Sequence, residues 1–411
     1  QGYSSAASDV YKRQIRNVYK ECKGVPKSNC LTKEQRLSLQ MDEFMNRRYE
    51  FRYNTQIGEV EYRERFSFQF YFHPIDKRAQ NSIMLDAQSE GIGVWDRDID
   101  RYLHSNRVPI YNPLEEFLFH LPHWDGKDRI HALANRVPCK NPHWELLFHR
   151  WFLNMVSHWR GVDKMHANNT SPILVGRQGT HKSTFCREMI PPALRAYYTD
   201  SIDFSQKRDA ELYLNRFALI NIDEFDQITL PQQGFLKHIL QKPVVNLRKP
   251  HGRSVLELQR YASFIGTSNQ KDLLTDPSGS RRFICIEVTG NIDTTQPIDY
   301  EQLYAQAMHE IHHGERYWFD SEDEQIMTEN NREFEQTPAM LQLFYQYFKT
   351  AQTKEEGEFL TPVEILNYLK KKSGMSLSDN KVYHFGRLLQ KCGIPSKHTY
   401  KGTVYQVIKL S

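Results

Sequence analysis

The sequence predicts an α/β protein built on a parallel sheet with helices on both faces, with an α+β region before it and a smaller helical module after it. Helical patterns alternate with short apolar runs, which is typical of a parallel sheet covered on both faces. Four runs predict its strands: Pro172–Val175, Phe217–Ile222, Tyr261–Gly266 and Phe283–Val288. The composition agrees, because 411 residues with 39% hydrophobic and 25% charged side chains fit a folded chain of two or three domains.

The region before the sheet divides into three parts. Residues 1–14 show no periodic apolar pattern and do not begin with Met, so we expect a non-native tail on a truncated N-terminus. Residues 15–106 are predicted as the α+β region, with a helix at Thr32–Arg48 and a strand at Phe66–Phe72, where phenylalanines alternate. Residues 107–170 are predicted as a helical region. Aromatic residues at helical spacing near its end favour a buried core over a base-stacking surface.

The rest of the chain is predicted to form two domains, at residues 171–325 and 337–411. Three helical patterns followed by a terminal hairpin predict a winged-helix-like domain in the second. The predicted helices lie near Pro338–Ala351, Pro362–Lys372 and Asn380–Lys391, and the predicted strands at Lys397–Tyr400 and Thr403–Ile408.

Positive charge gathers at the C-terminal end. The whole chain has a formal net charge of +4. Residues 361–411 hold nine lysines and arginines against Glu364 and Asp379, a net +7, so the remainder carries −3. A basic module on a near-neutral body indicates a polyanion partner, and we expect DNA contacts from Lys381, Arg387 and Lys391. A protein-docking module, or a basic face that only aids solubility, remains the alternative.

Cysteine usage and hydropathy indicate a cytoplasmic protein without a membrane contact. The six cysteines form no Cys-x-x-Cys pair, and scattered single thiols fit a reducing compartment. No apolar run approaches the roughly 20 residues that a membrane span requires. We also find no signal peptide pattern.

A glycine-containing loop follows the first predicted strand and begins a helix, in the order Gly176-Arg-Gln-Gly-Thr-His-Lys-Ser183. Backbone N–H groups of such a loop surround phosphates, its lysine reaches the β- and γ-phosphates, and its serine holds Mg²⁺. The pattern therefore predicts a P-loop NTPase with ATP and Mg²⁺ as ligands. The predicted nucleotide-binding residues are Gly176, Gly179, Thr180, His181, Lys182, Ser183 and Thr184.

One position of this loop departs from the usual pattern. His181 stands where phosphate-binding loops carry a glycine before the lysine. A side chain at this place either crowds the loop or adds a contact. The departure leaves open the hydrolysis rate and the affinity for nucleotide.

Polar residues end the next two predicted strands. Asp223 is predicted to bind Mg²⁺ together with Ser183, and Glu224 to polarise the attacking water. Asn269 would orient the same water. Arg281 or Arg282 would stabilise the γ-phosphate charge in a neighbouring subunit, although a solvated pair is the alternative. The predicted catalytic residues are therefore Lys182, Asp223, Glu224, Asn269, Arg281 and Arg282.

These motifs resemble the virulence-associated protein E family over roughly Asn106 to Trp318. The resemblance implies a superfamily 3-like helicase of the AAA+ class, carried by phages and other mobile elements, often beside primases. It rests on Gly176–Thr184, Leu219–Glu224, Gly266–Asn269, Gly279–Phe283, Tyr111-Asn112-Pro113 and Trp124-Asp125-Gly126.

The resemblance further implies a hairpin that grips single-stranded DNA in the pore of a ring. Residues 243–258 fit, because two apolar arms flank a basic turn. A merely solvated turn is the alternative. The cations and the histidine of this turn are Arg248, Lys249, His251 and Arg253. The implied partners are single-stranded or forked DNA, further copies of the chain in a hexamer-like ring, and a primase.

A second motif is interpreted as a chance match. His309 to His313 has the His-Glu-x-x-His spacing of zinc proteases, but both histidines continue the polar face of a helix that Gly314 ends. We therefore expect an ATP-dependent DNA helicase-like motor acting in the replication of a phage or mobile element. The alternatives are an NTP-binding regulatory switch, which His181 favours, and a nucleic-acid-binding protein that does not hydrolyse NTP.

Overall fold

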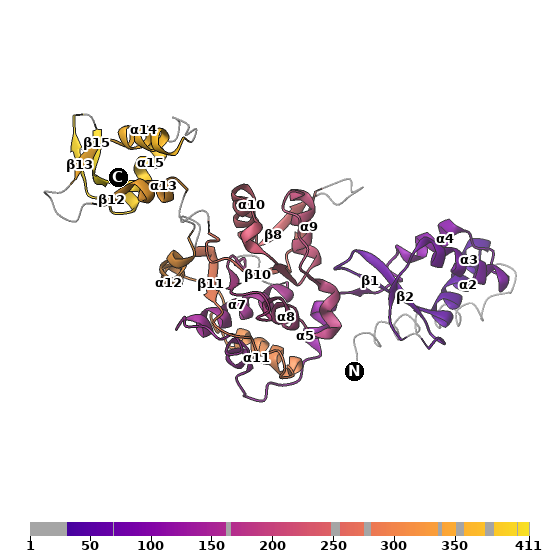
Figure 1. The fold of residues 1–411 in the computed structure, drawn as a ribbon. Helices are drawn as coiled ribbons and strands as arrows, with labels where there is room; N and C mark the ends of the chain where they lie inside the picture. The colour runs from indigo at the N-terminus through magenta and orange to yellow at the C-terminus, as the bar shows by residue number, and fades with distance from the viewer. Residues whose placement is uncertain are drawn as a thin grey trace.

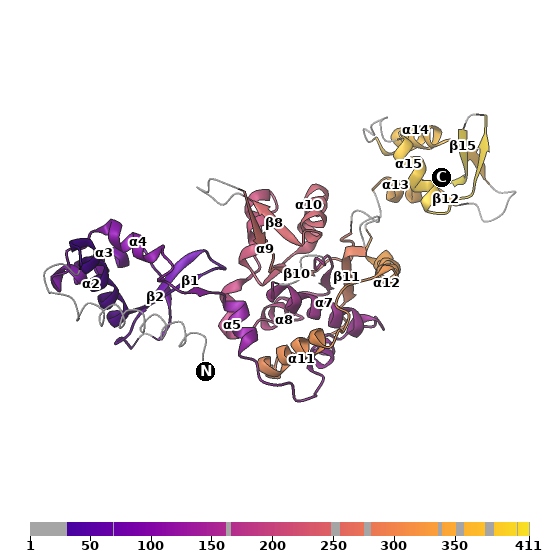
Figure 2. The ribbon, with the colours of Figure 1, turned by 180° about the vertical axis from the view of Figure 1, so that it is seen from behind.

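The computed structural model describes residues 31–68, 70–161, 166–247, 255–274, 281–335, 339–350, 357–374, 382–400 and 402–410. A central body holds a five-stranded sheet, with an N-terminal unit (residues 33–111) on one side and a C-terminal unit (residues 339–410) on the other (Figure 1). Figure 2 shows the same order from behind. The expected tail at residues 1–14 lies outside the described residues.

The N-terminal unit packs helices against a four-stranded sheet in the order β3-β2-β1-β4. Strands β1 and β2 are antiparallel, and β4 joins β1 in parallel. Phe44, Met45 and Ile83 are among its fully buried core residues. The elements are α2 (Lys33–Arg48), β1 (Tyr49–Asn54), β2 (Glu59–Glu64), β3 (His73–Pro74), α3 (Lys77–Ser89), α4 (Asp96–Leu103) and β4 (Ile110–Tyr111).

The strand predicted at Phe66–Phe72 is wrong. Its described residues form the connection between β2 and β3. Phe66, Phe68 and Phe70 are 73–95% exposed, so their alternation does not mark a buried face. Period-2 spacing predicts a strand only where one face packs against something.

The parallel sheet of the central body is confirmed. Its order is β11-β5-β10-β7-β6, and each neighbouring pair is parallel. The four predicted apolar runs form β5, β7, β10 and β11, and the two-residue β6 adds an edge. The strands are β5 (Ser171–Val175), β6 (Tyr198–Thr199), β7 (Leu219–Ile222), β10 (Ser263–Ser268) and β11 (Phe283–Glu287).

Helices cover both faces of this sheet, because neighbouring residues of one strand enter different cores. On β5, Leu174 packs with α7 and α11, whereas Ile173 and Val175 pack with α9 and α10. The first group of helices is α5 (Pro113–Phe119), α6 (Arg129–Ala134), α7 (Trp144–Trp159), α8 (Lys182–Glu188), α11 (Tyr300–His312) and α12 (Ser321–Asn331). The second is α9 (Lys207–Arg216) and α10 (Leu230–Leu240), and short 3₁₀ turns are η1 (Pro192–Tyr197), η2 (Phe225–Gln227) and η4 (Arg332–Phe334).

From Trp151 to Trp159, helix α7 is buried around its whole circumference. Trp144, Trp151 and Trp159 are at most 2% exposed. The aromatic spacing therefore marks core, as the sequence predicts, and the helices before the sheet share one core with it.

A two-stranded antiparallel hairpin leaves the central body between α10 and β10. It consists of β8 (Val244–Leu247) and β9 (Leu256–Gln259), with Val244 opposite Gln259. The predicted tip residues Arg248, Lys249, His251 and Arg253 lie outside the described residues.

The C-terminal unit has its own core, to which Phe344, Leu369 and Phe385 contribute. Strand β15 pairs antiparallel with β12, β13 and β14, so the described unit has four strands where the sequence predicts two. Its elements are α13 (Ala339–Tyr347), β12 (Phe348–Thr350), β13 (Glu358–Leu360), α14 (Pro362–Ser373), α15 (Val382–Lys391), β14 (Ser396–Thr399) and β15 (Gly402–Lys409). Throughout the described chain, no helix combines the length and apolar character of a membrane span.

Candidate functional site

The loop that links β5 to α8 needs two glycines for different reasons. A Cβ on Gly176 would lie 2.9 Å from the carbonyl oxygen of Val288, so only glycine allows the loop to approach β11 this closely. Gly179 has φ 84°, a conformation that side chains disfavour. Beyond it, the N–H of Ile292 donates to the carbonyl of Thr180 (3.1 Å) and ties the loop to the segment after β11.

Two non-glycine residues hold a positive φ within the described chain, and both were predicted as site residues. They are His181, with φ 65°, and Glu224, with φ 53°. The His181 ring nitrogen Nδ1 lies 3.5 Å from the hydroxyl of Thr294. Left-handed backbone at residues other than glycine is concentrated at functional sites. The departure from the loop pattern therefore coincides with a strained position.

Lys182 is 6% exposed, and its ammonium group turns back onto its own loop. Its Nζ donates to the carbonyl oxygens of Gly176 (2.7 Å) and Arg177 (2.8 Å) and to Oδ1 of Asn269 (3.2 Å). Burial lowers the pKa of Lys182, and the nearby carboxylate of Asp223 opposes that effect. The loop lysine and the asparagine after β10 thus lie in direct contact.

Asp223 joins the ends of three elements. Its Oδ1 accepts from the Ser183 hydroxyl of α8 (3.0 Å) and from the Thr267 hydroxyl of β10. Glu224 follows and is exposed. The predicted residues Thr180 and Thr184 belong to the same loop and the first turn of α8, and the Thr180 hydroxyl donates to the carbonyl of Arg177 (2.9 Å).

The oxygens of Ser183 and Asp223 fit a magnesium ion. Mg²⁺ prefers octahedral oxygen ligands at about 2.1 Å, which places neighbouring ligands about 3 Å apart. The two side-chain oxygens lie 3.0 Å from each other. Mg²⁺ is usually held by one or two side chains together with phosphate and water. The described residues contain no group of three or more His, Cys, Asp or Glu side chains that could hold a metal ion.

Asp226 belongs to the site although the sequence analysis missed it. Its Oδ1 accepts from the Ser268 hydroxyl (2.7 Å) and from the backbone N–H of Asn269 (3.4 Å). It therefore orients the segment that presents Asn269 to Lys182. The available signal was its position two residues after Glu224.

An acidic cavity of about 200 Å³ opens beside Asp223 and Glu224. Asp200 and Asp203, from the segment after β6, also line it. Neither was predicted, because this segment shares no motif with the loop or with the acids after β7.

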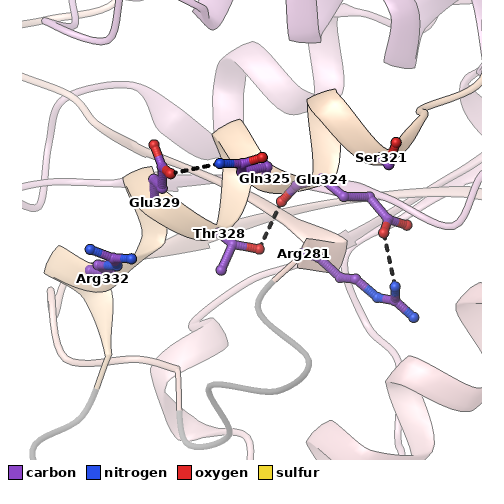
Figure 3. A pocket seen from close by; sticks show the side chains of 7 residues that line it. All are labelled: Arg281, Ser321, Glu324, Gln325, Thr328, Glu329 and Arg332. Carbon is purple, nitrogen blue, oxygen red and sulfur yellow. Dashed lines mark hydrogen bonds and ion pairs between the residues drawn. The ribbon is translucent and has the colours of Figure 1, made fainter. Parts of the chain in front are cut away.

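Arg281 lies apart from the lysine loop. Its guanidinium forms an ion pair with Glu324 of α12 (2.8 Å), and both residues line a hollow of about 380 Å³ (Figure 3). Thr328 and Arg332 line the same hollow. No described hydrogen bond or ion pair joins Arg281 to Lys182 or Asp223, and Arg282 precedes β11 beside it.

Of the predicted DNA contacts in the C-terminal unit, Arg387 is described in full. It is exposed on α15, its guanidinium lies 4.5 Å from the centre of the Tyr383 ring, and it donates to the Tyr383 hydroxyl (2.6 Å). Lys391 ends α15, and Lys381 lies outside the described residues.

The residues with the zinc-protease spacing, His309 to His313, make contacts within the fold. Glu310 Oε2 lies 2.6 Å from His149 Nε2, and its Oε1 accepts from Gln306 (2.9 Å). The rings of His309 and His313 stack on each other at 3.9 Å. Glu310 thus joins α11 to α7 instead of facing a metal.

The protein is an α/β protein with a parallel sheet, and it carries a buried loop lysine beside acids that follow a strand. Residues 118–336, more than half of the chain, match the family of the virulence-associated protein E-like domain, and the chain belongs to that family. Residues 337–407 match a domain of unknown function described from a B. Theta gene.

No curated protein matches the sequence. Similar solved structures include apo structures of the NrS-1 C-terminal region (305-718), one of them in an A form, at 11% identity and a TM-score of 0.46, covering 90% of this chain and 98% of the other. A further A form apo structure of that region has 12% identity and a TM-score of 0.43, covering 90% of this chain and 99% of the other.

Proposed function

We propose that this protein is an ATP-dependent DNA helicase-like motor, a P-loop NTPase of the superfamily 3-like AAA+ type that acts in the replication of a phage or mobile element. The observation that carries the proposal is that Lys182 contacts Asn269, and the adjacent Ser183 contacts Asp223, beyond the carboxyl ends of β5, β7 and β10. Ligands of open parallel sheets bind at this edge. Membership of the virulence-associated protein E-like family supports the mobile-element setting.

ATP would bind by replacing the internal contacts of Lys182. The ammonium now donates to the carbonyls of Gly176 and Arg177, and phosphate oxygens are stronger acceptors for a cation than these neutral oxygens. Release of the lysine would also free Oδ1 of Asn269. The asparagine would then be able to orient the water that attacks the γ-phosphate.

Ser183 and Asp223 would hold Mg²⁺, which when bound neutralises charge on the β- and γ-phosphates. Glu224 would accept the proton of the attacking water, since it is exposed beside Asp223 and lines the same cavity. Arg281 or Arg282 would act on the nucleotide of a neighbouring subunit in a ring, because Arg281 lies apart from Lys182 in its own chain.

DNA would be gripped by the β8–β9 hairpin and by the C-terminal unit. The hairpin arms support the first contact, with Arg248, Lys249, His251 and Arg253 at the tip. The exposed Arg387 supports the second, as would be expected of a winged helix that contacts phosphates. Single-stranded or forked DNA is the proposed substrate, and a primase is a proposed partner.

A regulatory switch is the second candidate, and the strained His181 favours it. Its side chain occupies a loop position that phosphate binding usually reserves for glycine. Such a loop could bind nucleotide and hydrolyse it too slowly to drive movement.

ATP turnover with and without single-stranded DNA separates these candidates. The motor predicts turnover that DNA stimulates and that Lys182→Ala reduces by at least about 100-fold, the scale of losing a phosphate-stabilising charge. Lys77→Ala, on the distant helix α3, is the matched control and keeps turnover. ATP binding without DNA-stimulated turnover would favour the switch, and absence of ATP binding would contradict both.

A further inference from the structure

Arg260 is a fully buried arginine, at 0% exposure, that no part of the nucleotide site uses. It lies between β9 and β10. Its guanidinium donates to five backbone carbonyls: those of Ala262 (2.9 Å), Ile239 (3.3 Å), Leu240 (2.8 Å), Lys242 (2.7 Å) and Asn168 (2.9 Å).

Among the described residues no carboxylate pairs with Arg260, and such a buried cation needs a reason, because moving a charge out of water is unfavourable. Burial lowers the pKa of Arg260 to about 9, which leaves the side chain protonated at neutral pH. Only arginine offers five donors in one plane. Ile239 and Leu240 are the last residues of α10, where carbonyls lack the partners of the helix interior, and the Ile239 carbonyl also accepts from the N–H of Lys242 (3.2 Å). The side chain therefore satisfies several buried acceptors at once.

The five carbonyls come from segments that meet at one edge of the sheet. Asn168 precedes β5 and Ala262 precedes β10, so both lie at the amino-terminal ends of parallel strands. Lys242 precedes β8, the first arm of the hairpin. At their opposite ends, β5 leads to the Lys182 loop and β10 to Asn269. One side chain thus joins the hairpin base to the two strands that carry the nucleotide-site residues.

Further contacts fix the same base to α9. The Asn215 amide donates to the carbonyl of Gln259 (2.7 Å), and Lys242 forms an ion pair with Glu211 (2.6 Å). The N–H groups of Tyr261 and Ala262 both donate to the carbonyl of Leu214 (2.8 and 3.0 Å). These bonds hold the hairpin to one helix, whereas Arg260 holds it to α10 and the sheet.

We propose that Arg260 is a positioning residue that makes the hairpin base, β5 and β10 one rigid body, so that DNA binding at the hairpin and ATP binding at Lys182 affect each other. The path is short: β9 passes through Arg260 into β10, which ends at the Asn269 that contacts Lys182 (3.2 Å). The inference rests on the proposed function, since it concerns coupling within that motor.

The test compares Arg260→Lys with the unmodified chain. Lysine keeps the charge but offers three donors instead of five. We expect ATP affinity and turnover without DNA to stay within about twofold, while the stimulation of turnover by single-stranded DNA falls at least about fivefold, the lower end of ordinary coupling between sites. Asn215→Ala, which removes one bond at the same base and leaves all five Arg260 bonds, is the control and keeps the stimulation.

Two results would overturn the inference. One is full stimulation of turnover by DNA in Arg260→Lys. The other is an equal fall of turnover with and without DNA, accompanied by a lower melting temperature, because that result would show that Arg260 is needed only for folding. If the variant does not fold, hydrogen exchange of the unmodified chain decides: protection of the Tyr261 and Ala262 amides must change when ATP binds, and unchanged protection contradicts the coupling. Failure of the unmodified chain to bind ATP contradicts the proposed function as well, and is seen before any variant is made.

Discussion

At the scale of single residues, the site is marked by strain and by burial of charge. His181 and Glu224 each hold a left-handed backbone, a conformation that costs on the order of 1–3 kcal/mol outside glycine. Lys182 keeps an ammonium group at 6% exposure. Folded chains retain such costs where the surroundings enforce them. Here both features fall on the loop and the strand end that are proposed to bind nucleotide.

Sequence spacing was sufficient to select Lys182, Ser183, Asp223 and Asn269, because loop and strand-end motifs leave a local pattern. It did not select Asp226, although that residue stands two positions after Glu224, and it could not select Arg260. The partners of Arg260 are backbone carbonyls from separate segments. Every residue type has a backbone carbonyl, so no sequence pattern identifies these partners. Likewise, the sequence shows that position 181 holds histidine instead of the usual glycine, but it does not show the φ angle of that residue.

Variants of His181 test the strain. Replacement by glycine, which adopts φ 65° freely, should leave the free energy of unfolding within about 1 kcal/mol, because relief of strain offsets the larger entropy of the unfolded chain. His181→Val should lose about 1–2 kcal/mol, since a β-branched residue is disfavoured at positive φ. Urea unfolding of both variants measures the difference. Equal stability of the two would show that the backbone there is not left-handed.

At the scale of elements, burial decides which patterns predict correctly. Continuous apolar runs predicted β5, β7, β10 and β11, and these strands are buried. The alternation at Phe66–Phe72 failed because those rings are exposed. Several strands that the sequence analysis did not predict, such as β6, β12 and β13, have only two or three residues, too few for any period to appear. Strand β1, with six residues, was not predicted either.

The close packing of the loop against β11 gives a test at this scale. Gly176→Ala should destabilise the protein by about 1–3 kcal/mol, because its Cβ would lie 2.9 Å from a backbone oxygen that has little room to move. Gly234→Ala, within α10 and with no atom within 4 Å of the added carbon, is the matched control. It should stabilise by about 0.5–1 kcal/mol, the helix propensity difference. Thermal or urea unfolding reports both, and a neutral Gly176→Ala would contradict the geometry.

At the scale of the whole molecule, positive charge gathers on a unit separate from the central parallel sheet. The C-terminal unit has its own core, to which residues of α13, α14, α15 and β15 contribute. Its basic residues therefore belong to a unit distinct from the parallel sheet. The sequence indicated a separate unit through its charge and through three helical patterns followed by a hairpin, although the unit's four-stranded sheet was not predicted in full.

Salt dependence tests whether this unit contacts DNA. Arg387→Ala should reduce the slope of log affinity against log salt by about one, as expected when one phosphate contact is lost. Arg101→Ala, an exposed arginine of α4 in the N-terminal unit, should leave the slope unchanged. Fluorescence anisotropy with labelled single-stranded DNA at several salt concentrations measures both. An unchanged slope in Arg387→Ala would remove this residue from the DNA interface.

We propose that Asp223 and Glu224, the acids after β7, support the attack of water on ATP bound by Lys182. The most direct test is ATP affinity and turnover of Glu224→Gln in the presence of single-stranded DNA, beside Glu59→Gln on β2 as the control. We predict unchanged affinity and a loss of turnover of at least about 100-fold, the usual contribution of a general base. Turnover at the unmodified rate in Glu224→Gln would contradict the claim.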